Sequence, residues 1–245
     1  MSTLEQAAPP PPPPPPAPSG PDGPKTIGVG WIVLGIVMAI LVIPAIFGGI
    51  AFAIAGDPDS DAALIAAQAF FAAGLVAVPF VVCRIEGIRD AAGRLGVRGF
   101  KPLSGLGWTI VAYLLFLGFT GVWFLIVGDQ TEQQVLQDIG AEKDTVVLVL
   151  QGVLVVGLAP ISEELFFRGF LFGGLRGRLS FWPAALISGI FFGSIHLLGG
   201  SIEVIPPLAA FGVLLAWLYE RTGSLGPPML MHALQNAIAF TITVS

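Results

Sequence analysis

The sequence predicts an all-α fold, a bundle of transmembrane helices. Of its 245 residues, 55% are hydrophobic and only 11% are charged, and the mean hydropathy is +0.86. A soluble domain would carry charges on about a quarter of its residues. Apolar runs of more than about 18 residues recur along the chain, and runs of that length cross a bilayer as helices. These runs are continuously apolar, which argues against the alternating strands of an outer-membrane barrel.

Apolar length defines seven expected spans. They lie near residues 28–55, 62–83, 105–128, 147–175, 182–199, 203–219 and 226–244. Several prolines lie inside or at the start of these runs, where membrane helices tolerate them as kinks or first-turn residues. Residues 27–245 are therefore expected to form one polytopic transmembrane domain, with the lipid bilayer as its surroundings.

The first 26 residues have a different composition. Pro9 to Pro16 are eight consecutive prolines, which adopt an extended polyproline II conformation and pack no core. We expect residues 1–26 to be a disordered tail and spacer. A proline run also suits an aromatic groove on a partner, and the sequence identifies no such partner.

The loop charges predict the orientation of the chain. The loop 84–104 carries five of the eleven Lys and Arg residues, and the loops before and after it are acidic. Lys and Arg are retained on the cytoplasmic side of a membrane. The tail is thus expected in the cytoplasm and the C-terminus outside, in a multi-pass protein of the cell membrane. A net charge of −5 with few basic residues argues against nucleic-acid binding.

A few ionisable residues lie deep inside the expected spans. A charge at the centre of a span costs about 2.5–3.5 kcal/mol on insertion scales, so function is the default explanation. Both histidines of the chain belong to this set, and the only asparagine, Asn236, lies one turn beyond the second histidine. The set is Glu163, Glu164, Arg168, His196 and His232.

Helical spacing pairs these residues. Glu164 and Arg168 are four residues apart and share a face, so the guanidinium can neutralise the carboxylate. Glu163 points about 100° away and is free to face another group. The same spacing joins Phe192 with His196 and His232 with Asn236.

Depth along the helices also brings the residues together. At about 1.5 Å per residue, Glu163 lies roughly 18 Å from the cytoplasmic end of its span, His196 roughly 20 Å and His232 roughly 10 Å. A difference in helix tilt can account for the smaller depth of His232. We expect the three side chains to line one cavity that opens to the cytoplasm.

A carboxylate beside imidazoles and a carboxamide suits hydrolysis. Glu163 would act on water as a general base, and His and Asn donors would hold the oxyanion. Other protease designs fit less well: the chain has no His-Glu-x-x-His zinc motif and no Gly-x-Ser-x-Gly nucleophile motif. An aspartic dyad is excluded because no Asp lies within a span.

Three motifs in order resemble a known protease family. They are Glu163-Glu164-x-x-x-Arg168, Phe192-x-x-x-His196 and His232-x-x-x-Asn236. Together they resemble the CPBP family of CAAX prenyl proteases and bacteriocin-processing enzymes, also called Abi proteins. The resemblance covers residues 150–245, the expected catalytic core.

The resemblance implies a glutamate-dependent intramembrane endopeptidase that cleaves a peptide or membrane-protein substrate. Glu163 and His196 would activate water, and His232 and Asn236 would stabilise the oxyanion. Glu164, Arg168 and Phe192 would support the site. CAAX-type cleavage and bacteriocin or leader processing both remain open as the reaction.

Members of the family are often described as metalloproteases, so the alternative interpretation is that the same residues bind a metal ion. Glu163, His196 and His232 are candidate ligands for zinc or another divalent ion. We favour a metal-free site because Asn236 suits an oxyanion role.

Two other classes are weighed against the protease. One is a non-enzymatic scaffold or immunity protein that retains the motifs. The other is a proton-coupled transporter, in which Glu and His chains relay protons. An inverted repeat would favour the transporter, and the sequence shows none.

Overall fold

The computed structural model describes residues 27–56, 60–127, 144–196 and 202–244. The proline-rich tail, most of the acidic loop 129–146 and residues 197–199 of the fifth expected span lie outside these ranges. Within them every regular element is helical, which confirms the all-α prediction. Short caps begin several helices: the Ser60 side chain accepts from Ala63 N before α3, and Asp144 accepts from Val146 N before α7.

The helices follow the expected spans. They are α1 (Val29–Val37), α2 (Ile43–Ala55), α3 (Asp61–Ile85), α4 (Ala91–Arg94), α5 (Pro102–Val127), α7 (Thr145–Gly152), α8 (Ala159–Glu164), α9 (Gly173–Arg176), α10 (Phe181–Ile195), α11 (Ile205–Thr222) and α12 (Gly226–Val244). π-Helical segments Met38–Val42, Val153–Leu158 and Leu165–Phe172 join α1 to α2, α7 to α8 and α8 to α9.

Five helical stretches in the described part of the chain are long and apolar enough to cross a membrane. They are Val29–Ala51, Asp61–Ile85, Pro102–Val127, Thr145–Arg176 and Ile202–Thr222. Of the other two expected spans, α10 is a shorter apolar helix of 15 residues. The 19-residue α12 is made less apolar by His232, Gln235 and Asn236. The protein is a multi-pass membrane protein.

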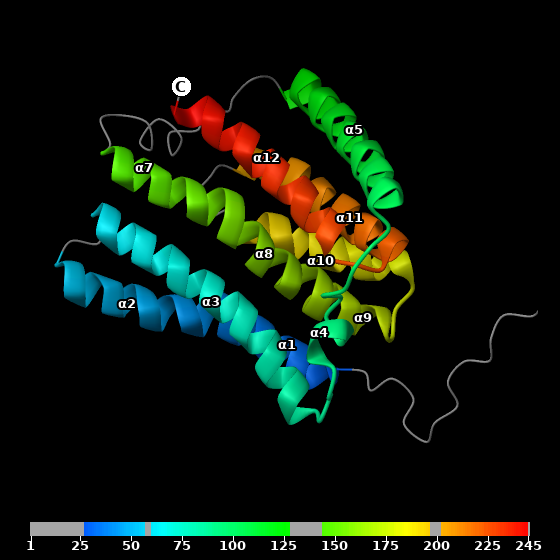
Figure 1. Cartoon of the computed structure of the whole chain (residues 1–245), viewed down its shortest axis with the longest axis horizontal. Coiled ribbons are helices and arrows are strands. Elements are labelled where there is room, and N and C mark those ends of the chain that lie inside the picture. Colours follow the sequence, from blue (N-terminus) through cyan, green and yellow to red (C-terminus); the bar gives the residue numbers. More distant parts are fainter. Residues whose placement is uncertain (1–26, 57–59, 128–143, 197–201, 245) are drawn as a thin grey trace, which may run out of the picture.

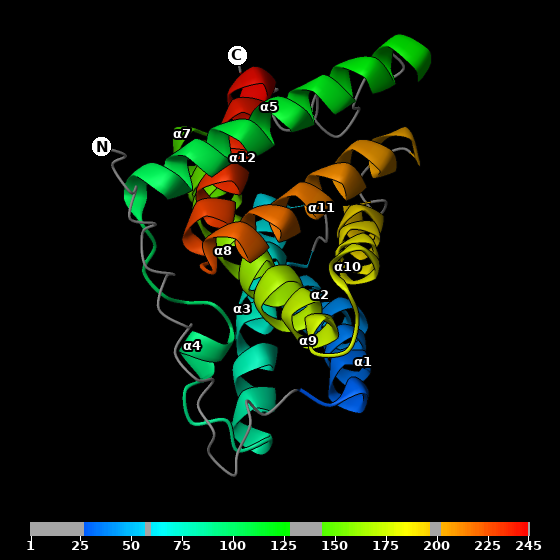
Figure 2. The same cartoon turned by 90° about the vertical axis from the view of Figure 1, so that its right-hand side faces the viewer.

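The long helix Thr145–Arg176 occupies the middle of the bundle. It lies between α2 and α3 on one side and α10, α11 and α12 on the other, while α5 lies at the edge (Figure 1). In the view turned by 90°, α5 runs across one side, above α11 and crossing α12 (Figure 2). Phe166, Phe167 and Phe170 of the central helix are fully buried and form much of the core.

Helices α10 and α11 pack at very close range because glycines face each other. A Cβ at Gly189 would lie 2.7 Å from the carbonyl oxygen of Ala209, and one at Gly193 would lie 2.9 Å from that of Ile205. Small residues of this kind allow membrane helices to approach closely. The contact places α11 directly against the central helix, where Gly212 takes part in the site.

The basic loop 84–104 is tied to the helix ends around it. Arg94 donates to the carbonyl of Gly173 at 3.2 Å, and Leu225 N donates to the carbonyl of Gly96 at 2.9 Å. A Cβ at Gly169 would lie only 2.4 Å from the carbonyl oxygen of Leu95. The cytoplasmic ends expected from the charge pattern thus gather at one end of the bundle.

Candidate active site

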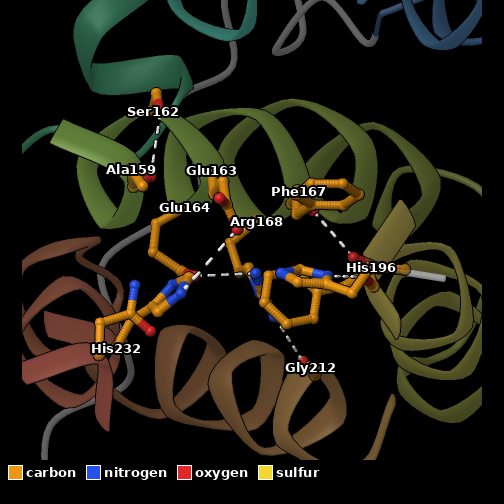
Figure 3. Close-up of polar contacts among 12 residues, drawn as sticks. Ala159, Ser162, Glu163, Glu164, Phe167, Arg168, His196, Gly212 and His232 are labelled. Atoms are coloured by element: carbon orange, nitrogen blue, oxygen red, sulfur yellow. Dashed lines mark hydrogen bonds and ion pairs between the residues drawn. The ribbon is translucent and has the colours of Figure 1, made fainter. Parts of the chain in front are cut away.

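The site is built on the α8 turn between two π-helical segments. π-Helical turns recur at functional sites. Glu163 and Glu164 are buried at its end, with exposed fractions of 8% and 0%. Figure 3 shows Glu164, Arg168 and His232 directed toward one another, with Glu163 beside them.

Glu164 is the centre of a buried ionic network. Its Oε1 accepts from Arg168 Nη1 at 2.8 Å, as the spacing of four residues predicts. The same oxygen lies 2.8 Å from Nδ1 of His232 on α12. A buried carboxylate is stable when it is paired and hydrogen-bonded, and Glu164 has both partners.

Arg168 is fully buried and held from three directions. Besides Glu164, its Nη2 donates to the carbonyl of Gly212 on α11 at 3.1 Å. The guanidinium carbon lies 4.5 Å from the centre of the Phe192 ring on α10, a cation–π contact. Arg168 therefore ties α10 and α11 to the central helix, the supporting role implied for Arg168 and Phe192.

Glu163 differs from its neighbour because it makes neither of the short contacts, to Arg168 and to His232, that hold Oε1 of Glu164. Oε2 of Glu163 is buried and has no hydrogen-bond partner within the described residues, as is also true of Oε2 of Glu164. It lies 3.9 Å from Nε2 of His232, beyond hydrogen-bond distance. A buried carboxylate oxygen without a partner is costly, and here it is available to a bound water or substrate.

His196 ends α10 and faces the same space as Glu163. Its Nδ1 lies 2.8 Å from the carbonyl of Phe192. A carbonyl only accepts, so Nδ1 carries the proton and Nε2 of the neutral ring is left as an acceptor. The ring centres of Phe192 and His196 are 4.9 Å apart, which matches the shared face expected from their spacing.

A cavity of about 360 Å³ joins these two residues. Apart from Glu163 and His196, its wall comes from the α1–α2 region, α3 and the end of α10. The lining residues are Ile40, Pro44, Ala67, Gln68, Phe71 and Ile195. His232 is 3% exposed and does not line the cavity.

The expected opening of the cavity toward the cytoplasm stays a prediction. Toward the basic end of the bundle, Glu163 is followed by the fully buried side chains of Phe166, Phe167 and Phe170. The cavity lies beside α3 and the π-helical segment Met38–Val42.

Asn236 has a partner that explains a feature of the central helix. Its Nδ2 donates to the carbonyl of Val155 at 2.8 Å. In a π-helical turn, that carbonyl would pair with the nitrogen of residue 160, which is a proline and has no N–H. Asn236 thus takes the place of the missing donor. The carboxamide of Asn236 has a second N–H, which this contact does not use.

The candidate metal ligands do not form a metal site in the described residues. No group of three or more His, Cys, Asp or Glu side chains there is close enough to hold an ion. His232 Nδ1 is engaged by Glu164, so only its Nε2 remains near Glu163. Catalytic zinc takes three protein ligands, and this donor set does not fit one.

Comparison with known proteins agrees with the motifs. Residues 145–238 match the family model described as "Type II CAAX prenyl endopeptidase Rce1-like". This part of the chain is similar to the Rce1-like family. The match includes Glu163, Arg168, His196, His232 and Asn236.

Two curated relatives extend the similarity beyond the Rce1-like segment. "Putative membrane peptidase YdiL" of Bacillus subtilis (strain 168) is 28% identical over 207 residues, 81% of this chain and 80% of that protein. An "Uncharacterized 24.3 kDa protein" of Escherichia coli is 25% identical over 166 residues, 66% of this chain and 75% of that protein. No solved structure matches the chain.

Gln68 is absent from the candidate residues that the sequence predicts, yet the cavity wall includes this side chain from α3. A signal was present: between Asp61 and Arg84, Gln68 is the only residue with an amide, hydroxyl or charged side chain.

Proposed function

We propose that the protein is a glutamate-dependent intramembrane endopeptidase in which Glu163 activates water. The observation that carries this proposal is the free carboxylate oxygen of Glu163, buried at a cavity that also contains His196. Glu164 has a similar sequence setting but is committed to Arg168 and His232. The two adjacent carboxylates therefore have different roles: Glu163 acts on water, and Glu164 organises the cations.

The first step is attack on the scissile carbonyl. Water between Glu163 and His196 gives a proton to the carboxylate as its oxygen bonds to the carbonyl carbon. The Nε2 acceptor of His196 holds the second water hydrogen and orients the attack. Glu163 then returns the proton to the leaving amine as the C–N bond breaks.

The oxyanion formed in this step needs donors, and the geometry supports His232 as one. Nδ1 of His232 lies 2.8 Å from Oε1 of Glu164, while its Nε2 lies 3.9 Å from Oε2 of Glu163. Nε2–H of His232 and the remaining N–H of Asn236 would stabilise the oxyanion.

The reaction is tested with purified protein reconstituted in liposomes. We expect Glu163→Gln to abolish peptide cleavage while the protein remains inserted and folded. Retained cleavage by this variant would remove Glu163 as the base. A chain that folds correctly but cleaves no peptide in any form would favour the scaffold or immunity protein.

Metal dependence is tested on the same preparation. We propose that no step uses a metal, and we expect full activity after exhaustive chelation. Activity that is lost on chelation and restored by zinc would contradict this.

The substrate is proposed as a peptide or membrane protein, by CAAX-type cleavage or by leader processing. Comparing the membrane and secreted peptides of cells that carry the wild type or Glu163→Gln would identify it. Peptides that accumulate uncut in the variant are the substrates, and their ends distinguish the two reactions.

A further inference from the structure

Gln68 occupies an unusual place for a polar side chain. It lies within an apolar transmembrane helix, half-buried, and lines the cavity that contains Glu163 and His196. Within the described residues its carboxamide makes no hydrogen bond. An amide in a membrane interior without a partner is costly, so its presence at the cavity calls for a partner that arrives from outside the chain.

The rest of the wall is apolar. Ile40, Pro44, Ala67, Phe71 and Ile195 complete it together with the two catalytic candidates. Helix α2 packs chiefly on α3, and α10 chiefly on α11, so the cavity lies between two separately packed units. Such a wall suits the apolar side chains of a substrate but offers nothing to its backbone.

A peptide about to be hydrolysed has a backbone that needs partners. To expose its carbonyl, the segment around the scissile bond must leave the helical hydrogen-bond pattern, and no bulk water replaces the lost bonds in the membrane. One glutamine amide offers an acceptor and two donors. It can therefore bind both an N–H and a C=O of an extended strand.

We propose that Gln68 is a substrate-binding residue that hydrogen-bonds the backbone of the peptide beside the scissile bond. The apolar wall receives the flanking side chains, and Gln68 fixes the register of the strand against Glu163 and His196. This inference rests on the proposed endopeptidase function, and it assigns part of the active site to the N-terminal half of the chain, outside residues 145–238.

The first test compares two glutamine variants. Gln68→Met keeps the length of the side chain and removes its hydrogen-bonding groups. Gln235→Met makes the same change on α12, where Gln235 accepts from Tyr113 at 3.1 Å outside the cavity wall. The probe is a fluorogenic farnesylated peptide ending in a CAAX sequence, assayed beside its unprenylated form. We expect Gln68→Met to lower kcat/KM about tenfold, the equivalent of one lost hydrogen bond, and Gln235→Met to leave it unchanged.

The second test separates a backbone contact from a structural role. In a series of probes, each amide N–H near the scissile bond is replaced in turn by an ester oxygen, which removes one donor. We expect one ester position to lower kcat/KM about tenfold with the wild type and to have no further effect with Gln68→Met. An equal ester penalty in both proteins at every position would overturn the assignment.

Binding of the same probes to Glu163→Gln, followed by fluorescence anisotropy, keeps the two proposals distinguishable. A probe that is cut normally by Gln68→Met overturns the Gln68 assignment and leaves the proposed function intact. A probe that is still cut by Glu163→Gln overturns the proposed base. If the double variant Glu163→Gln/Gln68→Met binds the probe more weakly than Glu163→Gln does, the role of Gln68 is still supported.

Discussion

At the scale of single residues, the two adjacent glutamates differ in the direction in which their side chains leave the helix, and therefore in their contacts. They are neighbours in sequence, yet Glu164 is directed at Arg168 and His232, and Glu163 faces the cavity. The roughly 100° between successive side chains of a helix accounts for this difference. One carboxylate thereby belongs to the ionic network, and the other faces the cavity, where we propose that it activates water.

Replacing Glu164 should destabilise the fold, whereas replacing Glu163 should abolish cleavage with little effect on stability. Glu164→Gln leaves the buried Arg168 guanidinium without its counter-charge, and we expect a loss of about 3–5 kcal/mol in the free energy of unfolding. Glu163→Gln removes no hydrogen bond from Oε2 and should change stability little while abolishing cleavage. Denaturant titration in detergent micelles measures both. Equal stability of the two variants would contradict the assignment of Glu164 to the ionic network.

Asn236 has two candidate roles that one double variant can separate. As an oxyanion donor it should contribute about 10²–10³ in kcat, so Asn236→Ala would slow turnover by that factor. As a partner of the Val155 carbonyl it would only replace the N–H that Pro160 lacks.

Pro160→Ala restores a backbone N–H at the position that Val155 faces. If Asn236 serves only the helix, adding Pro160→Ala to Asn236→Ala should recover the rate. We expect no recovery, because the oxyanion would still lack its donor. Single-turnover kinetics of the four proteins in this cycle decides between the roles.

At the scale of elements, the central helix is positioned by close contacts along its length. Its C-terminal part lies against the basic loop, where Gly169 meets the backbone of Leu95, and against α11 through the Gly212 carbonyl. Its N-terminal part is held by Asn236 on α12. These contacts come from three separate segments, so the position of Glu163 depends on their joint packing.

Two glycines of the central helix provide a matched test of that packing. A Cβ at Gly169 would lie 2.4 Å from the carbonyl oxygen of Leu95, whereas one at Gly157 would have nothing within 4 Å. We expect Gly169→Ala to lower the free energy of unfolding by about 1–3 kcal/mol, because backbone must move. Gly157→Ala should be neutral or stabilising by up to about 1 kcal/mol. Thermal unfolding of both variants in detergent is the measurement.

At the scale of the whole molecule, the basic residues that the charge pattern assigns to one side of the membrane lie together at one end of the bundle. Arg94, Arg176 and Arg178 bind partners there, among them Glu220 of α11 and the carbonyl of Ile27. We propose that this end faces the cytoplasm, as the excess of Lys and Arg predicts.

Orientation can be measured with single cysteines because the native Cys83 is buried. In right-side-out vesicles, we expect an impermeant maleimide to label Asp144→Cys and to spare Lys101→Cys until the membrane is opened. The reverse pattern would place the basic loop outside and invert the proposed topology.

The sequence by itself determined the class of fold and the main spans, and it singled out most residues of the candidate site. Long apolar runs can satisfy their backbone in lipid only as helices, so composition was enough for the all-α bundle. The spacing of four residues was enough for the Glu164–Arg168 pair because both partners lie on one helix. Scarcity of charge in the spans then made the remaining polar residues conspicuous.

Only the tertiary structure decided which residues from different helices meet. His232 reaches Glu164, Asn236 reaches Val155, and Gln68 lines the cavity beside Glu163, over separations that no local periodicity encodes. Contacts within a helix follow from its geometry, whereas contacts between helices depend on how their surfaces pack together.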